Sequence, residues 1–363
     1  MLYGKYNLKM RQKEYKMINI ITQKAGCLPP EAGNGQGKGL ITMIRREKNV
    51  LAVDVGGTKI CFGLVTPEGQ ILARQQYETQ RMEAPQWTRQ LMDHLTPFLE
   101  QQGGTEALAA IGLGIRGSVD HRTQRLRTSS VIRNAAQFDI CGTLSQAYGL
   151  PVYMDNDVKA VALYQLLFGV GRQRKTFACI NVGTGLAMGL VMDGVLIRGC
   201  CNNAGEIGNM LYARPGDGVL DFVETVASGQ GIDQERRRLE AQMGPADCGP
   251  TGKALAEACR RGDPVAEAVF DNVVGQLALI LLNLEAALDI GTYILVGGVM
   301  TDPWLRQRLT QQIMSISQQK QTGCFRWQAE LLVPRAGPAA GLCGAAGVAY
   351  YALKHKEDNH CNA

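Results

Sequence analysis

A carboxylate and a glycine-rich turn lie next to each other near the start of the chain. Asp54 follows the apolar run at residues 51–53, and a second apolar run occupies residues 60–65. The turn between the two runs consists of Gly56, Gly57, Thr58 and Lys59. Glycines allow a phosphate to approach backbone N–H groups closely, and a carboxylate at the strand end can hold a hydrated magnesium ion near that phosphate. The alternative is an ordinary hairpin that ends in an acid, since glycine motifs recur by chance.

A second glycine turn repeats this pattern in the other half of the chain. The sequence predicts a strand over residues 177–182 and a returning strand over residues 186–191. The turn between them consists of Gly183, Thr184 and Gly185. Two such hairpins indicate a duplicated α/β domain, in which one glycine loop from each half reaches across a cleft to the same polyphosphate.

Helices and strands must position these loops, and their apolar spacing can be followed along the chain. Apolar residues at helical spacing predict a helix near residues 87–99, in which Pro97 should produce a kink or shift the start. Further helices are predicted at residues 139–148, 158–168, 220–228, 253–261, 264–288, 304–318 and 339–353. Further strands are predicted at residues 107–115, 152–154, 293–296 and 327–333. The polar tail at residues 354–363 is expected to fray.

The composition is that of a soluble globular enzyme. The 363 residues suffice for about two domains, and 45% are hydrophobic and 20% charged. The net charge of +5 is too small and too dispersed to indicate nucleic-acid binding. The N-terminus lacks the long apolar core of a signal peptide, and the most apolar helical stretch, residues 277–288, is too short to span a bilayer. We therefore expect a cytoplasmic protein without a membrane partner.

Eleven cysteines raise the question of disulfides or a metal site. Five of them, Cys61, Cys141, Cys179, Cys259 and Cys343, lie singly inside apolar runs, and no C-x-C or C-x-x-C spacing occurs. Buried free thiols in a reducing cytosol explain this pattern better than a local zinc knuckle.

The first 49 residues differ from the rest of the chain. They are rich in Lys, Arg, Gly and Gln, with G-N-G-Q-G-K-G at residues 33–39. A disordered extension or a start site placed too early explains them best. The alternative is a remnant of a DNA-binding head, with a short helix at residues 11–24.

Six short motifs, each weak alone, occur in a specific order. They are D-V-G-G-T-K from residue 54, N-D-V at 156–158, N-V-G-T-G-L-A at 181–187, A-G-E-I-G at 204–208, E-T-V-A-S-G at 224–229 and V-G-G-V at 296–299. Their order and spacing resemble the ROK family of sugar kinases and repressors, within the actin-like ATPase and hexokinase superfamily. The resemblance covers about residues 50–353.

The resemblance implies an α/β fold of two actin-like ATPase (ribonuclease H-like) domains around a central cleft. The first domain would span residues 50–156 and the second residues 157–338, with the last helix, residues 339–353, packing back on the first. Residues 1–49 would be an extension outside both domains. A homodimer is expected.

The resemblance also assigns roles to residues. The residues implied for ATP binding are Asp54, Gly56, Gly57, Thr58, Lys59, Gly183, Thr184, Gly185, Gly297 and Gly298. Among them, Asp54 would hold Mg²⁺ through water, and Gly297 and Gly298 would flank the adenosine. The residues implied for sugar binding are Asn134, Asn156, Asp157, Glu206, Asn209 and Glu224. Asp157 matches the catalytic base.

The chemistry of a sugar hydroxyl supports the role of Asp157. The pKa of a sugar hydroxyl is high, so its attack on a γ-phosphate benefits from a carboxylate that accepts the hydroxyl proton. Asp157 follows a predicted strand and opens a predicted helix, whose N-terminal dipole stabilises the carboxylate. The alternative is that Asp157 only caps the helix, but a cap does not explain Asn156 beside it. Carboxylates such as Glu206 and Glu224 suit vicinal sugar hydroxyls because each offers two acceptor oxygens.

Three departures from the family pattern bear on the sugar and on zinc. Asn209 stands where the family often has histidine, and Arg116 stands where it commonly has proline. The cysteine cluster that binds zinc in many members is replaced by the shorter segment at residues 211–222, so no structural zinc is expected.

The resemblance implies an ATP- and magnesium-dependent kinase that phosphorylates a primary hydroxyl of a hexose or hexose derivative. Glucose is the default sugar, with N-acetylmannosamine, fructose and a β-glucoside as alternatives. A sugar-sensing transcriptional regulator is the alternative from another class, although its DNA-binding head would need more than the 49 residues that precede the body. A sugar-binding protein with decayed catalysis is a third, and the presence of Asp54, Lys59 and Asp157 argues against it.

Overall fold

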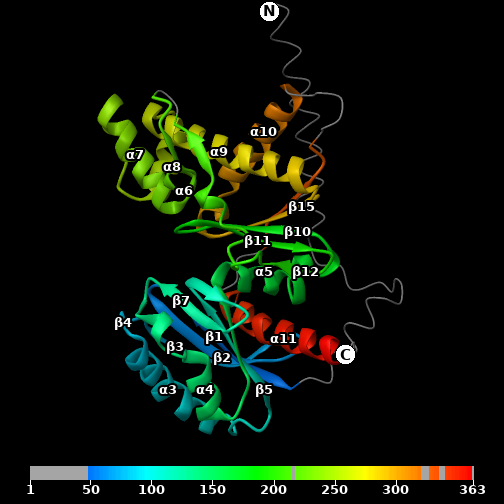
Figure 1. The fold of residues 1–363 in the computed structure, drawn as a ribbon. Helices are drawn as coiled ribbons and strands as arrows, with labels where there is room; N and C mark the ends of the chain where they lie inside the picture. Colours follow the sequence, from blue (N-terminus) through cyan, green and yellow to red (C-terminus); the bar gives the residue numbers. More distant parts are fainter. Residues whose placement is uncertain (1–47, 215–216, 320–326, 335–339, 362–363) are drawn as a thin grey trace, which may run out of the picture. The chain divides into compact units, whose positions relative to one another are not determined.

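The first half of the chain builds a five-stranded sheet with the order β3-β2-β1-β5-β9 (Figure 1). The computed structural model describes residues 48–214, 217–319, 327–334 and 340–361. The strands are β1 (Asn49–Val55), β2 (Lys59–Val65), β3 (Ile71–Glu78), β5 (Leu108–Ile115) and β9 (Val152–Asn156). β1, β2 and β3 form an antiparallel meander, whereas β1, β5 and β9 run parallel. The hairpin predicted around Asp54 is confirmed.

The second half repeats this arrangement. Its sheet has the order β12-β11-β10-β15-β16. The strands are β10 (Phe177–Val182), β11 (Leu186–Met192), β12 (Val195–Ile197), β15 (Thr292–Val296) and β16 (Glu330–Leu332). Three antiparallel strands are again followed by parallel pairing on the other side of the first strand. The predicted duplication of one α/β unit is therefore confirmed.

Two helices pack against each other and lie between the two sheets, α5 (Asp157–Leu167) and α11 (Ala340–Cys361) (Figure 1). α11 contacts β1, β2, β5 and β9, while α5 contacts β10, β11 and β12. Small residues permit this close approach. Gly112 on β5 lies against the backbone of Ala345 on α11. Gly344 on α11 lies against α5, where an added Cβ would be 2.9 Å from the backbone of Ala160. One buried apolar cluster joins both helices and both sheets.

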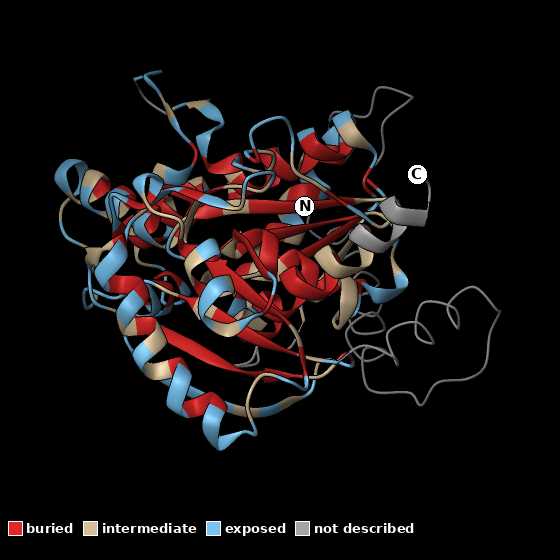
Figure 2. Cartoon of the chain, turned by 60° about the horizontal axis from the view of Figure 1, so that its bottom comes forward, coloured by how far each residue is buried: buried red, intermediate tan, exposed pale blue. Residues whose placement is uncertain are grey.

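Other helices cover the outer faces of the sheets. α3 (Ala84–Gln101) and α4 (Ile140–Tyr148) cover the first sheet, where Trp87 and Leu91 pack with Leu51 and Val53 of β1. The second sheet is covered by α6 (Glu224–Ala227), α7 (Gly229–Met243), α8 (Gly252–Arg260), α9 (Pro264–Leu288) and α10 (Pro303–Gln319). Figure 2 shows the resulting layers, with buried strands and inner helix faces and an exposed outer surface. Strands covered on both faces explain why β1 and β10 are apolar without alternation.

Short strands and turns complete the described residues. β4 (Met82–Glu83) pairs with β8 (Ile132–Arg133), β6 (Gly117–Asp120) with β7 (Arg125–Ser129), and β13 (Leu211–Ala213) with β14 (Leu220–Phe222). The 3₁₀ turns are η1 (Ala135–Gln137), η2 (Val170–Gln173), η3 (Ile207–Asn209) and η4 (Gly298–Thr301). β13 and β14, which lie in the segment at residues 211–222, therefore pair as antiparallel strands.

Several sequence predictions were wrong in detail. The helix predicted at residues 220–228 is strand β14 followed by the single turn α6, and the longer helix α7 was missed. α7 is rich in charged residues, so its apolar stripe is narrow and periodicity alone does not reveal it. The strand predicted at residues 327–333 is shorter, and α11 continues to Cys361 rather than fraying at residue 354. Pro97 does not shift the start of α3, which begins at Ala84 and runs through it.

α9 requires a further correction. It has 25 residues, so by length and composition it could cross a membrane, and the expectation that it is too short was wrong. Most of its most apolar stretch is buried inside the protein, however, and the core helix of a soluble protein can have the same length and composition. The predicted helix at residues 11–24 lies outside the described residues, and the proposed domain boundaries stay a prediction.

Two glycine substitutions test the packing of the central layer. A Cβ at Gly112 meets the carbonyl oxygen of Ala345 and lies 3.0 Å from the Cβ of Ala349, so Gly112→Ala must push α11 away from β5. We expect it to lower the free energy of unfolding by about 1–3 kcal/mol. Gly275→Ala on α9 is the matched control, since nothing lies within 4 Å of its added Cβ, and it should raise stability by up to about 1 kcal/mol. Chemical denaturation of both variants measures the difference. Equal effects of the two substitutions would contradict the close packing described here.

Candidate active site

The carboxyl ends of three parallel strands bring the polar residues of the first half together. Val55, Ile115 and Asn156 lie in register across β1, β5 and β9. The residues that follow each of them therefore meet at one edge of the sheet, where α/β proteins commonly bind ligands. This edge collects the glycine turn after Asp54, Arg116 after β5, and Asp157 after β9.

The first glycine loop is a tight turn. The N–H of Gly56 donates to the carbonyl of Lys59 at 3.1 Å, and Thr79, which follows β3, fixes the loop by donating to the carbonyls of Gly56 and Thr58. Gly57, Thr58 and Lys59 are exposed, so their backbone and the Lys59 ammonium are accessible to a ligand. Lys59 is placed at the start of β2, beside Asp54.

The second glycine loop and the Gly297–Gly298 turn share an edge of the second sheet. Asn181 of β10 pairs with Val296 of β15 in parallel. Gly297 follows Val296 directly, and Gly183 follows Asn181 after one residue, so both turns lie at the same end of the paired strands. The Gly183 carbonyl accepts from the N–H of Gly229 at 2.7 Å, which anchors the loop to the start of α7. Gly297 has φ +94° and lies against the carbonyl of Val182, a position that a side chain would not fit. The geometry therefore explains why glycine is needed at position 297.

Asn156, and not Asp157, is the N-cap of α5. Its side-chain oxygen accepts from the N–H of Val158 at 2.9 Å and of Lys159 at 3.4 Å. Asp157 is the first residue of the helix, and its carboxylate accepts from the N–H of Val158 at 3.0 Å. The alternative explanation of Asp157 as the cap is therefore wrong. With the cap supplied by its neighbour, Asp157 is free to serve another purpose.

Two carboxyl groups at this edge have raised pKa values. Burial and, to a smaller extent, the charge of Asp157 together raise the pKa of Asp54 from 3.8 to about 6, against the opposing charge of Lys59. Burial also raises the pKa of Asp157, against the opposing effects of the Val158 N–H and the Arg116 guanidinium. Raised carboxyl pKa values in a desolvated, charge-rich site are typical of catalytic groups, although structural networks also produce them.

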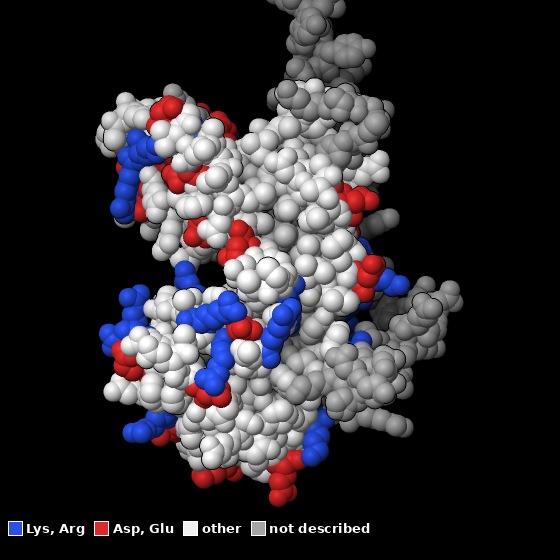
Figure 3. All heavy atoms as spheres, in the orientation of Figure 1, with Lys and Arg blue, Asp and Glu red and all other residues white. Residues whose placement is uncertain are grey.

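Charged side chains gather around this edge. Figure 3 shows basic side chains over β4 and β7 with acidic groups among them. Three arginines there are paired: Arg125 with Asp139, Arg127 with Asp120, and Arg133 with Glu83. Exposed pairs of this kind each contribute little to stability.

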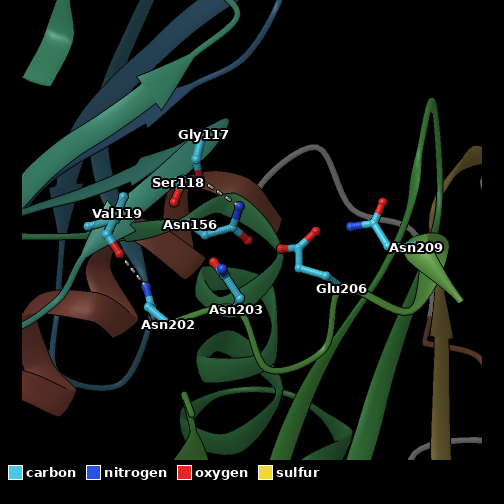
Figure 4. Close-up of a pocket in the computed structure, with 8 residues that line it drawn as sticks. All are labelled: Gly117, Ser118, Val119, Asn156, Asn202, Asn203, Glu206 and Asn209. Atoms are coloured by element: carbon cyan, nitrogen blue, oxygen red, sulfur yellow. Dashed lines mark hydrogen bonds between the residues drawn. The ribbon is translucent and has the colours of Figure 1, made fainter. Parts of the chain in front are cut away.

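A cavity of about 390 Å³ opens beside Asn156 (Figure 4). Its lining combines the start of β6 with the loop that follows β12, and consists of Gly117, Ser118, Val119, Asn156, Asn202, Asn203, Glu206 and Asn209. Figure 4 shows the side chains of Asn156, Glu206 and Asn209 around the same space. The Asn156 amide donates to the Gly117 carbonyl at 3.1 Å, which leaves its second N–H for a ligand. The cavity therefore offers amide and carboxylate groups to a polyhydroxylated molecule.

Three of the residues predicted to bind sugar, Asn134, Asp157 and Glu224, are not among those that line this cavity. Asn134 is exposed and donates to Glu83 at 2.8 Å, in the αL conformation with φ 51°. Glu224 is also exposed and accepts from the N–H of Leu186 at 2.8 Å, directly beside Gly185. Glu224 thus supports the second glycine loop in this structure.

A buried ionic network next to the cavity was missed by sequence reasoning. Asp155 is 1% exposed, pairs with Arg198 and accepts from the Asn202 amide at 3.1 Å. Asn202 also donates to the Val119 carbonyl at 2.9 Å, while its own side-chain oxygen is buried without a partner. Lys159 is 2% exposed, and burial lowers its pKa against the opposing charges of Asp155 and Glu206. The adjacent Asn202 and Asn203, directly before A-G-E-I-G, could have indicated from the sequence that polar residues gather here. No local sequence pattern indicated Arg198.

The cysteines agree with the prediction only in part. Cys61, Cys141, Cys179, Cys259 and Cys343 are free and buried. Cys200 and Cys201 are exposed, because they lie in the loop that leads to Asn202. Among the residues that the structure describes, no group of three His, Cys, Asp or Glu side chains could hold a metal ion.

The paired sheets, their shared helices and the glycine turns at their carboxyl edges define the actin-like ATPase fold. A sequence model of the ROK family matches residues 50–351, and this chain belongs to that family.

Sequence relatives are sugar kinases of different specificities. The chain is 27% identical over 320 residues to a glucokinase of Streptomyces coelicolor, which covers 82% of this chain and 96% of that protein. It is 28% identical to a β-glucoside kinase of Listeria innocua, over 69% of this chain and 83% of that protein. It is 27% identical to an N-acetylmannosamine kinase of Vibrio cholerae, over 73% of this chain and 89% of that protein.

Solved structures agree with this assignment. A ROK hexokinase from Thermus thermophilus is similar with a TM-score of 0.71 and 27% identity, over 85% of this chain and 99% of that chain. A ROK family glucokinase from Streptomyces griseus, in complex with glucose and AMPPNP, is similar with a TM-score of 0.63 and 28% identity, over 82% and 98%. A ROK family transcriptional regulator has the same fold, with a TM-score of 0.70, 22% identity and coverage of 83% and 77%.

The raised pKa of Asp54 predicts that Asp54→Asn stabilises the protein. Folding favours the protonated form of this carboxyl, so its contribution is present below pH 3.8 and is lost as the pH rises through about 6. A pKa raised from 3.8 to about 6 corresponds to roughly 2–3 kcal/mol at neutral pH. Without nucleotide and metal, the variant should therefore be more stable than the wild type at pH 7 by up to that amount, and the gain should vanish near pH 4.

Denaturation curves at both pH values test this expectation. Asp93→Asn, an exposed aspartate on α3, is the matched control and should show no such dependence. If the wild type is instead more stable than Asp54→Asn at pH 7, burial of the ionised Asp54 carboxylate does not destabilise the protein.

Proposed function

We propose that this protein transfers the γ-phosphoryl group of ATP to a primary hydroxyl of a hexose or hexose derivative. The observation that carries the proposal is the position of Asp157. Its carboxylate lies at the sheet edge that bears the first glycine loop, and it follows Asn156, which lines the cavity. The proposal thus assigns the nucleotide to the glycine loops and the sugar to the cavity.

Asp157 would act as the general base. Its raised pKa makes its carboxylate a better proton acceptor than an exposed aspartate, while the Val158 N–H and Arg116 keep the ionised form accessible. As the hydroxyl oxygen bonds to phosphorus, the bond from phosphorus to the bridging β,γ-oxygen breaks, ADP leaves and the hydroxyl proton passes to Asp157. Asp155 is unsuited to this role because its oxygens are engaged by Arg198, Asn202 and the Asn156 N–H.

The nucleotide would bind between the two glycine loops. In this proposal the exposed N–H groups of Gly57 and Thr58 and the Lys59 ammonium bind one end of the triphosphate, the loop from Gly183 to Gly185 binds the other, and Gly297 and Gly298 flank the adenosine. Glu224 would then support the second loop rather than contact the sugar.

The site fits a magnesium ion. Asp54 is partly desolvated, and its pKa is raised by the like charge of Asp157, so a nearby divalent cation would relieve the repulsion. Mg²⁺ commonly binds one or two carboxylates together with waters and substrate phosphates, and Asp54 supplies such a carboxylate. When bound, the ion would neutralise charge on the phosphates. We propose no zinc.

The cavity residues suit a hexose. Glu206 and the unpartnered oxygen of Asn202 can accept hydrogen bonds from hydroxyls, and the free N–H of Asn156 can donate one. A site that hydrogen-bonds a sugar hydroxyl discriminates against the deoxy analogue, which would leave the buried oxygen of Asn202 unpaired. Glucose is the first candidate sugar. N-acetylmannosamine, fructose and a β-glucoside are the next candidates, because Asn209 stands at the cavity where the family often has histidine and so offers different polar groups to the sugar.

A coupled ADP-release assay over a broad panel of aldoses, ketoses, N-acetylhexosamines and β-glucosides tests the function. We expect ADP production that requires both magnesium and one sugar or a small group of related sugars. If no sugar raises ADP production above background while calorimetry still detects sugar binding, the sensor alternative is favoured. A mobility shift with DNA that is lost on deleting residues 1–49 would establish that alternative.

Asp157→Asn separates catalysis from structure. The variant keeps the shape of the side chain but removes the proton acceptor, so turnover should fall by about 10²- to 10⁴-fold. Sugar affinity measured by calorimetry should stay within about tenfold of the wild type, because the loss is at most about one hydrogen bond. Asp93→Asn on α3 is the control and should leave both quantities unchanged. Near-normal turnover of Asp157→Asn would exclude Asp157 as the base.

A further inference from the structure

Arg116 occupies the middle of the sheet edge that carries the proposed chemistry. It follows Ile115, the last residue of β5, and Ile115 pairs with Val55 on one side and with Asn156 on the other. The N–H of Arg116 donates to the Val55 carbonyl at 3.4 Å. Arg116 therefore lies between the glycine loop, which follows β1, and Asp157, which follows β9.

The side chain of Arg116 turns toward the glycine loop. A Cβ placed on Gly57 would lie 3.7 Å from the Arg116 Nη1, so the guanidinium lies directly beside the loop that would bind phosphate. The guanidinium charge also acts on Asp157, on the other side of the same edge. The side chain is half-buried, which limits its motion and its access to water.

Arg116 has no ion-pair partner among the described residues, unlike the nearby Arg125, Arg127 and Arg133. A half-buried cation without a carboxylate within ion-pair distance is available to an anionic ligand. Guanidinium binds phosphate oxygens in a bidentate manner and stabilises the charge that develops during phosphoryl transfer.

We propose that Arg116 binds the γ-phosphoryl group of the nucleotide during its transfer and is a catalytic residue of this protein. The inference rests on the proposed kinase function. It adds a cationic group contributed by the first sheet, between the glycine loop and the base, where the phosphoryl group must pass from ADP to the sugar hydroxyl. The guanidinium would hold two non-bridging oxygens of the phosphoryl group while Asp157 takes the hydroxyl proton.

The test compares Arg116→Gln and Arg116→Lys with the control Arg89→Gln, an exposed arginine on α3. Calorimetry with magnesium measures binding of ADP and of a non-hydrolysable ATP analogue. Arg116→Gln should weaken binding of the analogue at least tenfold more than binding of ADP, because only the analogue carries the third phosphate, and turnover should fall by about 10³-fold. Arg116→Lys should recover part of the turnover, since it keeps the charge but loses the bidentate fork.

The outcomes distinguish this inference from the proposed function. Equal weakening of both nucleotides, no weakening of either, or turnover of Arg116→Gln within about tenfold of the wild type would overturn the role of Arg116. If the wild type itself shows no sugar-dependent turnover but Arg116→Gln loses the preference for the analogue, the kinase proposal fails while Arg116 remains a γ-phosphate ligand. Sugar binding by calorimetry should be unchanged in both variants, which controls for misfolding.

Discussion

The close approach of α11 to β5 and α5 is the constraint on which the rest of the structure depends. Gly112 and Gly344 leave no room for side chains between backbones, and a shared apolar cluster fills the remaining space. Both helices of this layer also begin at the sheet edge that carries the proposed active site. α5 starts at Asp157, and the first turn of α11 places Gly341 against the Asp54 carboxylate. Packing between the two sheets therefore fixes the positions of the two carboxyl groups proposed for the chemistry.

Electrostatics at this edge follows from that packing. Burial raises the pKa of Asp54 and of Asp157, and the charge of Asp157 raises that of Asp54 as well. Asp155 is fully buried, pairs with Arg198 and accepts a hydrogen bond from Asn202. Breaking a buried pair is costly because it leaves an unpaired charge, so the Asp155 network ties the loop after β12 to β9. The same loop carries Glu206 into the cavity. A structural carboxylate and the proposed base are thus two residues apart, with different environments and different tasks.

The sequence predicted the parts of the fold that local patterns determine. Both glycine hairpins, α9 and the polar residues after β9 were found because strand ends and turns have local signatures. The sequence did not reveal that Asn156 caps α5, because Asn and Asp are equally good caps and adjacent here. Nor did it predict that Glu224 lies beside Gly185 or that Arg198 reaches Asp155, since such contacts depend on the packing of distant segments. The polar helix α7 was missed because tertiary contacts, not a strong apolar stripe, hold it in place.

The position of the phosphate on the product tests the central claim most directly. After incubation with ATP, magnesium and the preferred hexose, phosphorus–proton NMR correlations identify the carbon that bears the new ester. The account predicts coupling of the phosphorus to the two methylene protons of the primary alcohol, with stoichiometric ADP, and no transfer to the 6-deoxy sugar. Inorganic phosphate as the sole product, or an ester on a ring hydroxyl, would contradict it.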